Sequence, residues 1–403
     1  MKNKKILFLA AAMLLGAGSL ASCGNGVKGG NSIKVWAAKD DQAFLGQVVE
    51  KFKAAYPDYA NANIELGITE EPEVPAALKT DLAGSADVFH FAGDQLGLLA
   101  SSNYLYGIPA VLTANIGIDS AVLESGKVGG NQYGIPFTPN TYFMYYDASV
   151  YTAEDIKSLE TMMAKDVGDY KYNFGFDVAN GWYLQSYFFS AGCTIFGESG
   201  EDATKGIEPE DKALDVAKWV WDVYNGPNKD KFFRGKGDAQ CGTDIAAFVT
   251  GTWSAGTIAK NMTDNGGTYA CAPLPKLTIG GHEYEWKSVG DYKHIGVNAV
   301  TKNPELAATF AAFLANAESQ ALRYSLRGTA PTNAETAADE TIEWDASIVA
   351  QTEQLKHTFK QPTIYDKQGF WDASIAFGDD LKIADKSEIV DYFDRFVNTI
   401  VEA

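Results

Sequence analysis

The chain has 403 residues, of which 46% are hydrophobic, which is enough to build sizeable cores in roughly two or three domain-sized units. Its formal net charge at pH 7 is −19, and a surface this acidic repels phosphate backbones and anionic lipid headgroups. Composition therefore argues against nucleic-acid binding and against membrane attachment through basic patches. The 8 Trp, 20 Tyr and 22 Phe are many for this length, and we expect some of them to stack on flat ligands.

The N-terminus has the layout of a secretory signal. A basic stretch over residues 1–5 precedes an apolar stretch over residues 6–15, which is too short to span a membrane. Leu20-Ala21-Ser22-Cys23 resembles the bacterial lipoprotein box and predicts a lipoprotein signal peptide over residues 1–22 with lipidation of Cys23. Residues 23–32 are rich in Gly and Asn and predict a flexible tether. An ordinary signal peptide with an incidental cysteine is the alternative.

Three cysteines remain beyond Cys23, at positions 193, 241 and 271. An odd set cannot form a complete disulfide framework. Cys271 lies in an apolar, strand-like run and is predicted to be a small buried hydrophobic residue. Pairing of Cys193 with Cys241 stays open.

The folded part begins with alternating strand and helix patterns. Apolar residues recur every four positions after the first strand, which is typical of one face of an amphipathic helix. Asp40 and Asp41 precede that helix and can cap it. This succession predicts a parallel sheet with right-handed crossovers, on which ligands bind at the carboxyl ends of the strands. The predicted elements are strands at 33–35, 64–68 and 87–91 and helices at 44–56 and 74–82.

Later segments continue the α/β pattern, and the sequence contains no internal repeat, no low-complexity block and no second membrane span. Apolar residues line one side of the last helix, which favours its packing on the core. The predicted elements are strands at 142–146, 268–274 and 294–300 and helices at 214–224, 306–314, 341–359, 370–384 and 387–401.

The sequence offers no recognisable reaction centre. It has four histidines, and neither a His-x-x-x-His nor a Cys-x-x-Cys pair, which argues against zinc. Residues 252–256 read Thr-Trp-Ser-Ala-Gly and resemble a nucleophile elbow, but threonine replaces the first glycine that its strained turn needs. His90 lies within an apolar strand and is predicted to be a core histidine with satisfied hydrogen bonds. We expect no catalytic residue, no metal and no cofactor, and therefore a binding protein.

Several segments together resemble the bacterial extracellular solute-binding proteins of carbohydrate ABC importers. Residues 87–97 match the strand-to-helix signature of that family, and residues 133–147 match its first crossover between lobes. Residues 190–197, 303–320 and 370–373 extend the match, which covers essentially 33–403. The likeness is closest to the maltose- and maltodextrin-binding branch.

The resemblance implies an α/β, two-lobe periplasmic-binding-protein fold, with hinge-linked lobes and a ligand cleft between them. Lobe one is expected to comprise residues 33–142 plus 290–336, and lobe two residues 143–289 plus 337–403. The lobes are expected to close over the ligand by hinge rotation, which the ligand favours through its higher affinity for the closed state.

The resemblance also implies the ligand-binding residues. The alternative role of Asp40, Asp41 and Asp94 is helix capping. The alternative role of the two tryptophans is packing in the core. The residues are Asp40, Asp41, Phe91, Asp94, Asn140, Asn180, Trp182, Tyr183, Asp291, Lys293 and Trp371.

The chain departs from the branch pattern at several of these positions. Asn140 and Asn180 stand where acidic residues are usual, and Gln95 stands where an arginine is usual. An amide both donates and accepts, so it can still bind neighbouring hydroxyls. Trp182 and Trp371 match aromatics that stack on the apolar face of a sugar ring, while polar groups hold the hydroxyl rim.

The sequence therefore predicts a monomeric, lipid-anchored binding protein on the extracellular face of the cytoplasmic membrane. Its expected partners are an oligosaccharide, foremost a maltooligosaccharide, and the transmembrane subunits of an ABC permease, with no nucleic acid. Xylo-, fructo- and galacto-oligosaccharides are the rival ligands. There are two rival functions. One is a surface glycoside hydrolase with paired carboxylates, and the other is an adhesion or sensor lipoprotein that acts without a permease.

Overall fold

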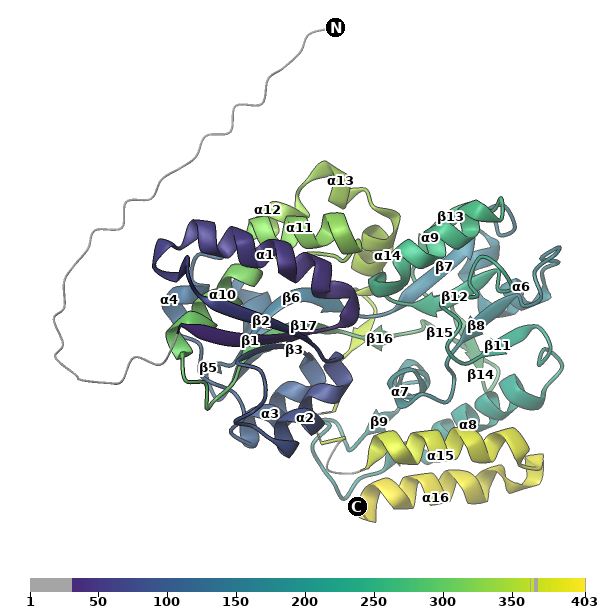
Figure 1. The fold of residues 1–403 in the computed structure, drawn as a ribbon. Helices are drawn as coiled ribbons and strands as arrows, with labels where there is room; N and C mark the ends of the chain where they lie inside the picture. The colour runs from purple at the N-terminus through teal and green to yellow at the C-terminus, as the bar shows by residue number, and fades with distance from the viewer. Residues whose placement is uncertain (1–30, 363, 366–368, 403) are drawn as a thin grey trace, which may run out of the picture.

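The computed structural model describes residues 31–362, 364–365 and 369–402, which form two α/β lobes lying side by side (Figure 1). Each lobe is built on its own five-stranded mixed sheet, which confirms the predicted α/β class. The predicted signal peptide, Cys23 and nearly all of the tether lie outside the described residues. Among the residues described, no helix is both long and apolar enough to cross a bilayer.

The sheet of lobe one contains the predicted parallel unit. β1 pairs in parallel with β2 on one side and β3 on the other, with Ile33 opposite Ile64, whereas β17 runs antiparallel to both β3 and β6. In order across the sheet, the strands are β2 (Asn63–Ile68), β1 (Ser32–Ala37), β3 (Val88–Ala92), β17 (Asp291–Val297) and β6 (Gly134–Asn140).

The sheet of lobe two combines parallel and antiparallel pairs. β12 is parallel to β8 and antiparallel to β7, and β13 is antiparallel to β7. In order across the sheet, the strands are β11 (Phe232–Arg234), β8 (Phe174–Phe176), β12 (Ala247–Thr250), β7 (Phe143–Asp147) and β13 (Tyr269–Ala272). The shorter pairs are β4 (Lys127–Val128) with β5 (Asn131–Gln132), β9 (Thr194–Ile195) with β10 (Ile207–Glu208), β14 (Leu277–Ile279) with β15 (His282–Tyr284), and β16 (Ser288–Val289) with β18 (Thr358–Phe359).

Helices pack on both sheets through their apolar faces. In α1 (Gln42–Ala55), Phe44, Val48 and Phe52 are buried against the lobe one sheet, as the four-residue spacing predicts. The other helices near this sheet are α2 (Val74–Thr80), α3 (Leu96–Ser101), α4 (Ala110–Thr113), α5 (Ser120–Leu123), α10 (Pro304–Leu314), α11 (Ala317–Arg327) and α12 (Ala334–Ala337).

Lobe two carries the remaining helices, and Figure 1 shows the two C-terminal ones lying side by side along its lower edge. In α16 (Ile389–Glu402), Ile389, Phe393, Phe396 and Ile400 are buried, which confirms the predicted apolar side. The others are α6 (Leu159–Ala164), α7 (Gly181–Ser190), α8 (Glu210–Asn225), α9 (Ala255–Asp264), α14 (Ala346–Gln354) and α15 (Phe370–Ile383), with α13 (Glu340–Glu343) between α12 and α14.

The chain passes between the two lobes at short connections. Thr141 and Tyr142 link β6 to β7, and Gly290 alone separates β16 from β17. A third passage runs from α12 through α13 to α14, which packs on β13 and β7 of lobe two. These crossings lie close to the predicted lobe boundaries, which stay a prediction.

Two expectations about local structure are wrong. Residues 341–359 do not form one helix, because the Asp345 carboxylate accepts a hydrogen bond from the backbone N–H of Ser347 at 2.9 Å and starts a new helix there. The segment after that helix instead enters a strand pair, β16 with β18. The second wrong expectation is the burial of Cys271, which is only partly buried. Cys193 and Cys241 are both free thiols, so the disulfide between them, which the sequence left open, is excluded.

Candidate ligand-binding site

A cavity of about 820 Å³ lies between the two lobes, within the range of ~300–1,000 Å³ typical of small-molecule sites. It is lined by the ends of β1, β3 and β6 from lobe one and by the starts of α7 and α15 from lobe two. The strand ends predicted to carry the site therefore do face one cavity. The predicted residues that line it are Asp40, Asp41, Asp94, Asn140, Asn180, Trp182, Lys293 and Trp371.

A buried ion-pair network forms one wall of the cavity. Asp41 is 1% exposed, and its carboxylate accepts hydrogen bonds from Arg323 at 3.2 Å and from Arg327 Nε at 3.1 Å. Burial is the largest single influence and raises the pKa of Asp41, but Arg323 and His90 together outweigh it and hold that pKa well below its usual value. Asp41 stands at the N-cap of α1 without making a capping bond. Its role in the fold is thus to tie α11 to the end of β1.

Two neighbours complete this network. Asp40 is 69% exposed, and its carboxylate lies 3.4 Å from Arg327. His90 is buried, but its Nδ1 lies 3.7 Å from the Asp41 carboxylate, which is too long for a hydrogen bond. The prediction of a core position for His90 is confirmed, but neither of its ring nitrogens has a hydrogen-bond partner within the described part of the chain, so the prediction of satisfied hydrogen bonds is wrong.

A second wall follows β3. Asp94 lies in the short 3-10 helix η4 (Gly93–Gln95), and its place there is not that of a helix cap, because Ala92 and Gln95 occupy the N-cap positions of η4 and α3. Gln95, which replaces the usual arginine, donates to the Glu71 backbone carbonyl at 3.0 Å. Lys293 Nζ lies 3.1 Å from Glu71 Oε1. The cationic groups of lobe one in this cavity are thus neutralised by nearby carboxylates.

Aromatic rings form the opposite wall, on lobe two. The rings of Trp182 and Trp253 lie 5.8 Å apart with an interplanar angle of 45°, and Lys293 Nζ lies 5.4 Å from the Trp253 ring centre. The indole of Trp371 packs beside Gly181, and a Cβ added to Gly181 would lie 3.0 Å from it. Asn180 caps α7, since its side-chain oxygen accepts from the Trp182 backbone N–H at 2.9 Å. The cap fixes the start of the helix that carries Trp182.

Three predicted residues do not line the cavity. Phe91 is 0% exposed and stacks on His294 at 5.5 Å, because alternate residues of β3 point into the core of lobe one. Tyr183 packs edge-on against Trp182 at 5.2 Å, behind the ring that faces the cavity. The Asp291 carboxylate packs so closely on Gly93 that a Cβ added to Gly93 would collide with it.

Asp291 supports the site from behind. Its carboxylate accepts from the Tyr292 backbone N–H at 2.7 Å. Burial, together with the neighbouring carboxylate of Asp94, raises the pKa of Asp291 to about 8. Asp291 is therefore mostly neutral at pH 7 and sits between the second crossover and the turn that carries Asp94.

Several cavity residues escaped the sequence-based prediction. Trp253 and Thr252 follow the lobe two strand β12, and the sequence analysis relates residues 252–256 only to a nucleophile elbow, which it rejects. An aromatic residue three positions after a buried strand is the available signal. Arg323 and Arg327 lie four residues apart on one face of α11, but nothing in the sequence indicates their partner, Asp41. The remaining unpredicted charged residues are Glu70, Glu71 and Lys236.

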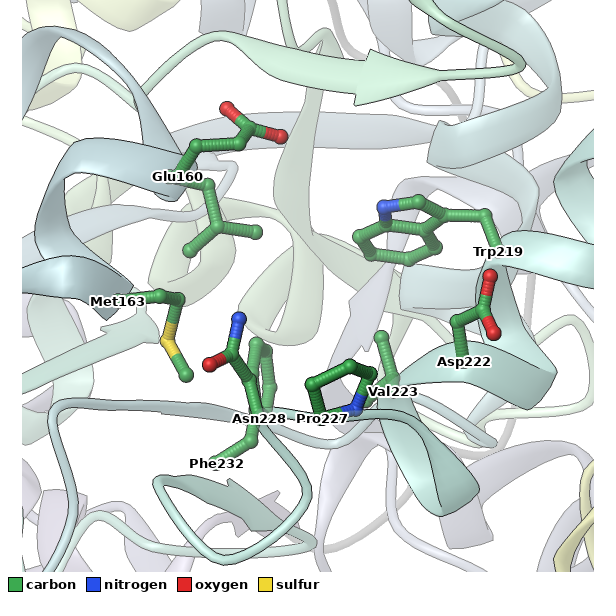
Figure 2. A pocket seen from close by; sticks show the side chains of 9 residues that line it. Glu160, Met163, Trp219, Asp222, Val223, Pro227, Asn228 and Phe232 are labelled. Carbon is green, nitrogen blue, oxygen red and sulfur yellow. The ribbon is translucent and has the colours of Figure 1, made fainter.

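A smaller pocket of about 230 Å³ lies on lobe two beside α6 and α8. Figure 2 shows Met163 and Trp219 on opposite sides of it. It includes none of the predicted ligand-binding residues, and the Trp219 ring stacks on Phe176 at 6.2 Å within the lobe core. The described residues also contain no group of His, Cys, Asp or Glu side chains that could hold a metal ion. The cavity between the lobes is therefore the candidate site.

The chain is similar to known binding proteins over nearly its whole length. The galactooligosaccharide-binding protein of Bacillus subtilis (strain 168) is 24% identical over 399 residues, which cover 92% of this chain and 90% of that protein. A solved structure described as "with acarbose" is 30% identical, with a TM-score of 0.84, and the match covers 93% of this chain and 99% of the other.

Further similarity supports the fold. MalX from Streptococcus pneumoniae, solved in complex with maltopentaose, is 21% identical with a TM-score of 0.75, and the match covers 92% of this chain and 99% of that one. The family model for bacterial extracellular solute-binding proteins matches residues 47–350. The predicted two-lobe periplasmic-binding-protein fold is thereby confirmed, and the chain belongs to the bacterial extracellular solute-binding protein family.

Proposed function

We propose that this protein captures a maltooligosaccharide or related α-glucan outside the cell and delivers it unchanged to the transmembrane subunits of an ABC permease. The observation that carries the proposal is the division of the cavity into two kinds of wall. Trp182, Trp253 and Trp371 line it from lobe two, beside the polar side chains of Asn180 and Lys236, while carboxylates, amides, guanidinium groups and one ammonium group line it from lobe one. A pyranose offers an apolar face and a rim of hydroxyls, and these two walls match them.

The electrostatics of the cavity favour an uncharged ligand. Its buried charges are already paired, since Asp41 binds two arginines and Glu71 binds Lys293. An ionic ligand would have to displace one of these partners and leave the other buried without a counter-charge, which is costly. Paired charged groups still accept and donate hydrogen bonds at their free edges, as sugar hydroxyls require. The similar proteins that were solved with acarbose and with maltopentaose support an α-glucan.

The sequence features supply the rest of the proposal. The lipoprotein box at residues 20–23 supports anchoring through Cys23, which would hold the protein beside its permease. Short connections between the lobes, at 141–142 and at Gly290, support a hinge. A ligand that touches both lobes binds the closed state more tightly and thus shifts the protein toward it.

The test is a calorimetric titration of the purified protein with maltotriose, galactotriose, xylotriose and a fructotriose. We expect heat with maltotriose and little with the others. Flat titrations with every sugar would refute the proposal. Heat with galactotriose alone would favour the second candidate, a galactooligosaccharide receptor, which the B. subtilis relative and the amides at Asn140 and Asn180 support. Prolonged incubation with maltooligosaccharides, followed by chromatography, tests for release of hydrolysis products.

A further inference from the structure

Trp253 lines the cavity between the lobes from the turn that joins β12 to α9. Its ring lies against the backbone at Gly251, since a Cβ added to Gly251 would collide with the indole. An aromatic side chain that is already held in its binding position loses little conformational freedom when a ligand stacks on it. The contacts that hold the turn over residues 250–254 therefore bear directly on binding.

The two hydroxyl side chains at the ends of this turn bind one carboxylate oxygen. The hydroxyl of Thr250, the last residue of β12, donates to Asp238 Oδ1 at 2.7 Å, and the Ser254 hydroxyl donates to the same oxygen. Thr250 is 1% exposed and Ser254 is 6% exposed, so little water reaches these hydrogen bonds. Asp238 belongs to the loop between β11 and β12. A single oxygen atom of that loop thus joins both ends of the turn that carries Trp253.

The Ser254 hydroxyl does not have the role that its position suggests. Ser254 occupies the N-cap position of α9, where a serine hydroxyl usually accepts a hydrogen bond from the helix backbone. Within the described part of the chain, its side chain makes no such capping bond and donates to Asp238 instead. The hydroxyl therefore serves the turn and not the helix, and Ser254→Ala removes the bond to Asp238 without removing a cap.

The middle of the turn is fixed as well. The Gly251 carbonyl oxygen accepts from the Tyr145 hydroxyl at 3.0 Å and from the Ser254 backbone N–H at 3.2 Å. Tyr145 is buried on β7, in the core of lobe two. The backbone under the Trp253 ring is thus tied to the lobe core, and Asp238 ties the two ends.

We propose that Asp238 is a positioning residue for the ligand, because it holds the turn from Thr250 to Ser254 so that the Trp253 ring faces the cavity before the ligand arrives. The inference rests on the proposed function, since it requires a ligand that stacks on Trp253. Asp238 does not itself line the cavity, so it acts through the ring. Both hydroxyls donate to Oδ1, so an amide oxygen at the same place could accept both bonds without the negative charge.

The test is a double-mutant cycle between Asp238 and Trp253, measured by calorimetric titration with maltotriose and with galactotriose. The parent, Asp238→Ala, Trp253→Ala and the double variant are compared. Asp202→Ala is the matched control, because Asp202 Oδ1 also accepts from a threonine hydroxyl, that of Thr204 at 2.6 Å, but Asp202 does not line the cavity. The melting temperature of each unliganded protein shows that it is folded during the titration.

We expect Asp238→Ala to weaken binding by about tenfold, as loss of the prior ordering of one large side chain predicts. When Trp253 is already replaced by alanine, the same change should alter the Kd by no more than about twofold, because the ring on which Asp238 acts is gone. Asp238→Asn and Asp202→Ala should bind as the parent does. If Asp238→Ala does not fold, Ser254→Ala carries the test, with a smaller loss that also disappears without Trp253.

Three outcomes would refute the inference and leave the proposed function standing. The first is binding by Asp238→Ala as tight as by the parent. The second is an equal loss with and without Trp253, which would assign the effect to another group of the same loop, such as Lys236, which also lines the cavity. The third is an equal loss in Asp238→Asn and Asp238→Ala. Flat titrations of the parent with both sugars would refute the proposed function and the inference together.

Discussion

Trp253 is predicted to be the aromatic residue whose loss harms ligand binding most clearly. Its ring lies 5.8 Å from that of Trp182 and 5.4 Å from Lys293 Nζ, and it lines the cavity between the lobes. Trp253→Ala would remove this ring and leave a gap that only water can fill. Burial of an aromatic side chain contributes roughly 1.5–3 kcal/mol. Since about 1.4 kcal/mol corresponds to tenfold, we expect a Kd weakened by roughly 10- to 100-fold.

The assay is calorimetric titration with a maltooligosaccharide, with the melting temperature of the unliganded protein measured alongside. The melting temperature separates lost packing in the free protein from lost contact with the ligand. Trp344→Ala is the matched control, because Trp344 is 76% exposed and does not line the cavity. We expect this control to bind as the parent does. A Trp253→Ala protein that binds within twofold of the parent would refute the assignment of the aromatic wall.

Three further predictions concern the walls of the site. Asp41→Asn should lower the free energy of unfolding at pH 7 by on the order of 3 kcal/mol, since it leaves Arg323 buried without its counter-charge. Because the pKa of Asp41 is lowered in the folded state, its stabilisation is present above about pH 4 and is lost as the pH falls further, so parent and variant should converge in acid denaturation curves. The pKa of Asp291 is raised to about 8 in the folded state, so the folded protein holds a proton that the unfolded chain releases near pH 4. The free energy of unfolding of the parent should therefore fall as the pH rises from about 4 to about 8. Asp291→Asn should remove that loss, and an unchanged pH profile of melting temperature would contradict the prediction. Asn180→Ala should cost about 1 kcal/mol in urea unfolding through the lost cap of α7, whereas Asn180→Asp should retain it.

The sequence by itself determined the helices and strands, and it indicated the strand ends at which a ligand should bind. The spacing of Phe44, Val48 and Phe52 predicted the buried face of α1, and the strand–helix succession predicted the parallel unit of lobe one. The family resemblance implied Asp40 and Asp94, which follow β1 and β3, and both line the cavity. Such patterns depend on neighbours within a few residues, so the sequence displays them directly.

Only the tertiary structure decided which side chains meet. Asp41 and Arg323 are 282 residues apart, and their pairing makes Asp41 an anchor for α11 as well as a residue that lines the cavity. The resemblance implied Phe91 together with Asp94, yet Phe91 lies within β3, and the pleat of that strand directs its ring into the core. Trp253 became part of the site because lobe two faces lobe one across the cavity. Distances across a cleft depend on how two independently folded sheets are placed, and no short-range pattern along the chain encodes that placement.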